Sequence, residues 1–341
     1  MKIKFTFIQF SVILISLPFI SNTKAQEFIW DAGFNGFFDN REYYNDYTSP
    51  YTVSGSRAFA AIGISLHENY SISAGFNALY EFGSSVDQID VSPIIYFKFK
   101  KDPVLFFLGS FNRKNIVDMP DVFQIDTLQY FRPNIEGIFL EFKKNWGSQN
   151  VWLDWTSKKS PTDRESLNIG GTGKLYYSSF FFRWDFIMTH YALPEFFPPE
   201  YNIRDNGGIF AKLGVFDKRK NIFDSLSFST GVIMSYDRVK NEHDFYIRNG
   251  SISELFVQYK GVGIKSIVYF GEGQIQMQGD PLYLASFYNR NDFFWKIFRK
   301  DNIEGKAEFS LHIIENVVDV SQSLTLYVNV GGTKALKPEK N

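Results

Sequence analysis

The strongest constraint on this chain is an alternation of apolar and polar side chains with a period of two residues. From Phe180 to Thr189, one face carries Phe, Phe, Trp, Phe and Met, whereas the other carries Phe, Arg, Asp, Ile and Thr. The segment from Tyr70 to Glu81 alternates in the same way. Successive side chains of a β-strand point to opposite faces. Both segments therefore predict strands with one apolar face.

The same alternation recurs along the whole chain, in about sixteen segments of roughly ten residues each. Glycine recurs on the polar faces, where it would weaken a helix, so we expect no helix beyond the first 25 residues. The predicted strands are 28–38, 56–66, 70–82, 91–99, 104–112, 134–143, 150–158, 166–176, 179–190, 206–216, 225–237, 250–260, 262–271, 287–298, 304–313 and 320–330.

The connections between these segments alternate in length. Short gaps such as 67–69 and 144–149 alternate with long gaps rich in turn-forming residues. The largest of these long gaps include 39–55, 115–133 and 191–205. An even number of strands with short turns at one end and long loops at the other is typical of outer-membrane barrels. A soluble β-sandwich or propeller is the rival, since a half-buried sandwich strand alternates too. The aromatic residues (38 Phe, 19 Tyr and 6 Trp) favour the barrel, because many of them fall near strand ends.

In these features the chain resembles Gram-negative outer-membrane β-barrels of the porin-like kind. The resemblance covers residues 26–330 and rests on the pattern rather than on a sharp motif. It implies an all-β fold, a transmembrane up-and-down antiparallel barrel of about 16 strands (roughly 14 to 18), with short periplasmic turns and longer extracellular loops. Residues 331–341 depart from the family pattern as a polar C-terminal tail.

Residues 1–25 have the features of a cleaved signal peptide. Lys2 and Lys4 precede an apolar run that ends at Ile20, and small residues occupy Thr23 and Ala25. We expect cleavage before residue 26 and location in the cell outer membrane. No later apolar run reaches the ~20 residues of a membrane-spanning helix. The 36 basic and 37 acidic residues give no basic face for nucleic acid, and the absence of Cys excludes disulfides and thiol chemistry.

Motifs for catalysis or for cofactors are weak. The four His residues lie far apart, without metal-ligand spacing, and no GxSxG segment occurs. His312 falls on the inward face near the outer end of its predicted strand. Pairing between strands could still bring distant residues together. The sequence nevertheless predicts no enzymatic activity, no metal and no cofactor.

Charged side chains on the predicted strands share one face, which must be the inner one, because Arg or Lys facing lipid at mid-depth costs ~2–4 kcal/mol. We predict a porin-like channel for passive diffusion of small polar solutes, in which the long loop 115–133 folds inward and narrows the lumen. The predicted channel-lining residues are Arg57, Glu81, Glu141, Asp154, Lys174, Arg183, Asp185, Lys212, Glu254, Lys265, Arg290 and Lys306.

Two alternatives stay open at this point. One is a structural or surface-binding barrel with a plugged lumen, and the other is a barrel hydrolase, which membrane lipases and proteases exemplify. As partners we expect outer-membrane lipids and small polar solutes, with a homo-oligomer allowed and nucleic acid excluded.

Overall fold

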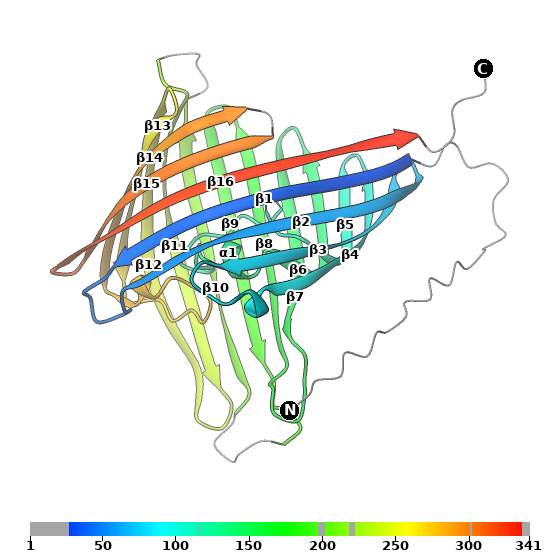
Figure 1. Cartoon of the computed structure of the whole chain (residues 1–341). Coiled ribbons are helices and arrows are strands. Elements are labelled where there is room, and N and C mark those ends of the chain that lie inside the picture. Colours follow the sequence, from blue (N-terminus) through cyan, green and yellow to red (C-terminus); the bar gives the residue numbers. More distant parts are fainter. Residues whose placement is uncertain (1–26, 115, 197–201, 218–221, 301, 336–341) are drawn as a thin grey trace.

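The chain forms a closed barrel of sixteen antiparallel strands, as the sequence predicts. This computed structural model describes residues 27–114, 116–196, 202–217, 222–300 and 302–335. Each strand pairs with its neighbours in the sequence, and β1 (Glu27–Glu42) closes the barrel against β16 (Val317–Ala335), which lies beside it in Figure 1. The predicted signal peptide lies outside the described residues.

The strands between these two run in simple up-and-down order. They are β2 (Tyr51–His67), β3 (Tyr70–Glu81), β4 (Asp90–Lys101), β5 (Val104–Asn112), β6 (Asn134–Lys144), β7 (Gly147–Ser157), β8 (Ser166–Tyr177), β9 (Phe180–Tyr191), β10 (Arg204–Phe216), β11 (Ser225–Val239), β12 (His243–Tyr259), β13 (Val262–Gly271), β14 (Phe287–Lys300) and β15 (Ile303–Ile314).

The period of two separates an apolar outer wall from a polar inner wall. In β9, Phe180 is largely exposed on the outside, whereas Arg183 and Asp185 are buried on the inside. Ile62 and Val232 are exposed on the outer faces of β2 and β11 in the same way. A belt of exposed apolar side chains around the barrel is what a lipid environment requires. Among the described residues, no helix is long and apolar enough to cross a membrane.

Most long connections lie at one end of the barrel, and most tight turns lie at the other. Two connections at the long-loop end are short, at 240–242 and 315–316. There the strands continue further than the sequence pattern indicated, and β12 begins at His243 rather than at residue 250. The last strand also continues, because Ala335 still pairs with Glu27 across the seam that closes the barrel.

Two of the long loops fold into the lumen, and we call them together the plug. The first, 113–133, contains the short helix α1 (Leu128–Phe131), and the second, 272–286, contains the 3-10 turn η2 (Pro281–Leu284). A further 3-10 turn, η1 (Val86–Gln88), lies in another loop. The plug loops bind each other, since the amide of Ile125 donates to the carbonyl of Gln278 at 2.7 Å. The inward folding of the first loop agrees with the expectation from the sequence.

Apolar packing also holds the plug inside the barrel. Phe123 and Leu282, one from each loop, are completely buried (both 0% exposed) and belong to the same apolar cluster as Phe139, Phe210 and Ile233 of the barrel wall. Burial of a Phe or Leu side chain contributes about 1.5–3 kcal/mol. The interior is therefore a packed core at this level rather than an open pore.

Candidate functional site

Arg41 and Arg290 of the barrel wall bind two acidic side chains of the plug. Arg290 on β14 lies 3.2 Å from Asp121 and 3.6 Å from Asp126, and its Nε lies 2.6 Å from Asp292 of its own strand. Arg41 on β1 contacts Asp126 at 2.6 Å. The acidic loop thus supplies the counter-charges for arginines that the strands turn inward.

The plug carboxylates have perturbed pKa values. Burial tends to raise the pKa of Asp126, but Arg41 and Arg290 outweigh it and lower this pKa to about 2. Asp280 lies at the start of η2 and has no such partner within ion-pair distance in the described structure. Burial therefore raises the pKa of Asp280 to about 6, although its carboxylate accepts a hydrogen bond from the amide of Leu282.

A Ser–His pair lies in the same region of the lumen, on β15 and β16. Nε2 of His312 lies 3.0 Å from Oγ of Ser321, and Nδ1 of His312 lies 2.7 Å from the hydroxyl of Tyr288 on β14. When Ser321 donates to Nε2, the proton of the neutral imidazole resides on Nδ1 and points at Tyr288. A nucleophile, a base and a third group that orients the base are the elements of covalent acyl transfer.

The loop between β1 and β2 covers this Ser–His pair. The ring of Tyr43 meets the imidazole of His312 edge-on, with 5.3 Å between ring centroids. Asp319, directly opposite His312 in the sheet, accepts hydrogen bonds from the amide of Tyr44 at 2.8 Å and from Asn45 at 2.6 Å. His312 is consequently 1% exposed and Ser321 is 9% exposed.

The predicted channel-lining residues lie on the inward faces of their strands, and several of them are engaged in ion pairs. Arg183 binds Asp185 of its own strand and Asp118 of the plug, which also binds Lys174 at 2.9 Å. Lys212 pairs with Glu254. Arg57 donates to the carbonyl of Gln129 in the plug, and Asp154 binds Arg113. Arg290 and Lys265 lie beside Asp121, and Lys306 binds Glu308. Two predicted residues lie near strand ends: Glu81 is exposed on β3, and Glu141 is half-buried near the tight-turn end of β6.

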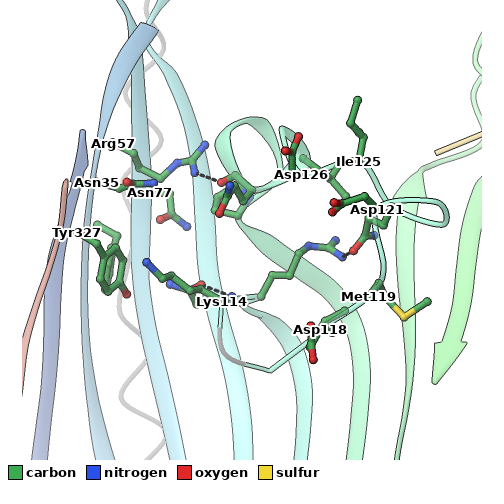
Figure 2. Close-up of a pocket in the computed structure, with 18 residues that line it drawn as sticks. Asn35, Arg57, Asn77, Lys114, Asp118, Met119, Asp121, Ile125, Asp126 and Tyr327 are labelled. Atoms are coloured by element: carbon green, nitrogen blue, oxygen red, sulfur yellow. Dashed lines mark hydrogen bonds between the residues drawn. The ribbon is translucent and has the colours of Figure 1, made fainter. Parts of the chain in front are cut away.

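Cavities remain between the plug and the wall. One, of about 260 Å³, is bounded by β1, β2, β3 and β16 on one side and by the plug on the other; Figure 2 shows Arg57, Asn77 and Lys114 around it. A second, of about 320 Å³, is lined by Ser323, the next inward-facing residue after Ser321. Polar space therefore extends along the inner wall close to the Ser–His pair.

Within the described ranges, no group of three or more His, Asp or Glu side chains is arranged to hold a metal ion.

The fold defines the class, an outer-membrane β-barrel of the porin-like kind. The loop L8 deletion mutant of OmpT from Vibrio cholerae superposes with a TM-score of 0.56 at 8% identity, covering 90% of this chain and 100% of that chain. The anion-selective porin of Comamonas acidovorans gives 0.54 at 7% identity, with coverage of 90% and 100%. Identities this low show the fold alone. No curated protein matches the chain.

The chain belongs to the lipid A 3'-O-deacylase-type family, whose family model matches residues 20–332. This family is named for an enzyme. The expectation from the sequence that the chain has no enzymatic activity is therefore wrong.

The sequence did not reveal the Ser–His pair, although both residues alternate onto the inward face. The predicted strands left 314–319 as a loop, whereas β15 and β16 are joined by a turn of only two residues, Glu315 and Asn316. That tight turn sets the register in which Asp319 faces His312 and Ser321 lies diagonally next to it. Recognising the short turn would have revealed the pair.

Proposed function

We propose that this protein is an outer-membrane hydrolase that removes ester-linked acyl chains from a glycolipid of the lipid A type. The observation that carries the proposal is the hydrogen-bonded pair of Ser321 and His312, in a chain whose family is named for such a deacylation. Export through the signal peptide and residence in the outer membrane belong to the same proposal.

The proposed reaction is a two-step acyl transfer. Oγ of Ser321 attacks the ester carbonyl carbon while its proton passes to Nε2 of His312. His312 then gives this proton to the alkoxide oxygen of the sugar as the ester bond breaks, which leaves an acyl-serine. Water attacks the acyl-serine, with His312 again accepting and returning the proton, and the fatty acid leaves. Tyr288 keeps the imidazole oriented throughout.

Access to Ser321 requires displacement of its cover. Tyr43 belongs to the loop between β1 and β2, and its ring packs against His312. The closed arrangement shields the pair from water, and movement of this loop opens it to an acyl chain. Loop motions of this kind commonly precede catalysis in lid-gated enzymes.

A lipid-cleavage assay with the full chain in detergent or in vesicles tests the proposal. We expect release of a fatty acid from purified lipid A, and a loss of at least about a hundredfold in rate for both Ser321→Ala and His312→Asn. Ser323→Ala, on the same face of β16, is the matched control and should retain the parental rate. Parental rates in Ser321→Ala would eliminate the nucleophile, and no release by the parent protein would eliminate the function.

Passive passage of small polar solutes is the second candidate. The cavities between the plug and the wall favour it, because they leave polar space along the lumen. Planar-bilayer recordings of the parent chain test it, with a variant lacking 116–131 as the open reference. If only the deletion conducts, the plug closes the barrel and passage is not the function of the parent protein. One similar structure, OmpT of Vibrio cholerae, is described as a trimer form, and a homo-oligomer of this chain is a further proposal.

A further inference from the structure

Four lysines lie on the two tight turns that join β4 to β5 and β6 to β7. The first turn carries Lys100 and Lys101, the second carries Lys143 and Lys144, and all four residues are exposed. The turns lie side by side, because β5 pairs with β6 and the amide of Lys143 donates to the carbonyl of Pro103 at 2.9 Å. We call these four lysines the basic corner.

Few carboxylates oppose the basic corner. Oδ2 of Asp102 lies 3.5 Å from Nζ of Lys144, and the Asp102 side chain is 88% exposed, so this ion pair contributes little. Glu68 is the acidic residue of the neighbouring turn, 67–69. On the inner faces of the adjoining strands, Lys98 and Glu141 add one charge of each sign. The corner therefore keeps a net positive charge.

The basic corner begins where the apolar outer face of the barrel ends. Leu140 and Phe142 are exposed on the outside of β6, and the period of two makes Lys144 the next outward residue. In β4, the same alternation leads from the exposed Ile95 to Lys101. Two ammonium groups thus follow directly on side chains that face lipid.

Trp146 indicates that this corner lies at the level of the lipid headgroups. Its side chain is half exposed, and its ring lies against Phe142 with 6.3 Å between the centroids. Tryptophan is enriched at membrane–water interfaces, because its ring is apolar and its N–H is polar. The turn between β8 and β9 also carries aromatic residues, Tyr176 and Tyr177, but 176–180 contains no charged residue. The lysines are therefore a feature that not every interfacial turn shares.

We propose that the basic corner binds the headgroup of an anionic phospholipid. Lys101 and Lys144 attract the negative headgroup, and the acyl chains lie along Phe142 and Leu140. A lysine close to an anionic membrane surface strengthens binding about fivefold. The apolar side chains beside the lysines favour a phospholipid over a soluble anion. The corner lies at the tight-turn end of the barrel, away from the Ser–His pair, so lipid binding there does not depend on hydrolysis.

Quenching of a bimane fluorophore on Asn145→Cys tests the site, since the chain has no other cysteine. The labelled full chain is placed in phosphatidylcholine vesicles, and brominated phosphatidylglycerol or brominated phosphatidylcholine replaces part of the lipid as the quencher. We expect phosphatidylglycerol to be preferred at least about tenfold. The same fluorophore on Ser179→Cys, in the turn without charged residues, should show no such preference. Lys101→Gln combined with Lys144→Gln should reduce the preference at Asn145→Cys at least about fivefold.

Two further variants of the labelled protein separate this effect from misfolding. Asp102→Asn removes the carboxylate beside Lys144 and should increase the preference about twofold, a gain that misfolding does not produce. Lys240→Gln, at the long-loop end, is the matched control and should leave the preference unchanged.

Equal quenching by the two lipids at Asn145→Cys, or a preference that survives the double lysine variant, would overturn the proposal. Relief of quenching by inorganic phosphate at constant ionic strength would overturn it as well, because the ligand would then be a soluble anion. None of these results depends on the cleavage assay, so the two proposals fail separately.

Discussion

Arg41 and Asp126 are 85 residues apart in the chain, yet Nη2 of the first lies 2.6 Å from Oδ1 of the second. One belongs to the first strand of the barrel and the other to the loop between β5 and β6. Arg290 reaches the same carboxylate from the opposite end of the sequence. Asp126 therefore joins the plug to β1 and to β14, strands that lie on opposite sides of the seam between β1 and β16.

Asp126→Asn should loosen the plug. The change leaves Arg41 and Arg290 with one counter-charge fewer in a largely buried setting, where loss of one partner costs about 3–5 kcal/mol. Because the Asp126 side chain is 28% exposed, solvent screening reduces this cost, and we expect a loss of about 2 kcal/mol. Limited proteolysis should cut 113–133 faster than in the parent. Asp244→Asn, at an exposed position on β12, is the control, and equal cleavage of all three proteins would contradict the assignment.

Docking of the second plug loop should weaken as the pH rises. Burial raises the pKa of Asp280 to about 6, so the folded loop favours the neutral carboxyl. This stabilisation is fully present below the unfolded pKa of 3.8 and is lost as the pH rises through about 6. About two pKa units correspond to roughly 3 kcal/mol.

Hydrogen exchange of amides in 272–286 measures this effect. Protection should fall between about pH 4 and pH 7 in the parent protein after correction for the intrinsic exchange rate. Asp280→Asn mimics the neutral acid and should flatten the dependence, whereas Asp87→Asn, at an exposed site on another loop, should not. A dependence that persists in Asp280→Asn would assign the effect to another group.

Phe123→Ala should destabilise the barrel through a cavity in its interior. The Phe123 side chain is completely buried within the apolar cluster that joins the plug to the wall. Truncation of such a side chain costs about 3–5 kcal/mol. The midpoint of urea unfolding, read from tryptophan fluorescence, should fall clearly. Leu284→Ala, which is 41% exposed in the other plug loop, should shift it much less, and similar shifts would argue against a packed plug.

Labelling of single cysteines should establish which end of the barrel faces outward. The chain has no native Cys, so Lys159→Cys in a long loop and Glu68→Cys in a tight turn can each be read without interference. We expect an impermeant maleimide to label Lys159→Cys on intact cells and Glu68→Cys only after the outer membrane is disrupted. The reverse pattern would invert the topology.

The sequence by itself determined the barrel and the sidedness of its wall. Alternation is a local property: Phe180 and Arg183 are assigned to opposite faces by their spacing along one strand, whatever the rest of the chain does. The cost of a charge in lipid then decides which face points inward. The number of strands followed from counting the alternating segments. The strand ends in the structure differ from the predicted ends where the turns are tighter than expected, as at 240–242 and 315–316.

The sequence predicted that the loop 115–133 folds inward, but only the tertiary structure decided which contacts fill the lumen. The Ser321–His312 pair depends on the register across a two-residue turn, and an error of a few residues in that turn hides it. The plug depends on contacts such as Arg41 with Asp126, which lie 85 positions apart, so that no local pattern predicts the contact. The contact of Arg57 with the carbonyl of Gln129 in the plug likewise joins residues 72 positions apart in the chain. These features arise from pairing between distant segments, which a pattern of neighbouring residues does not encode.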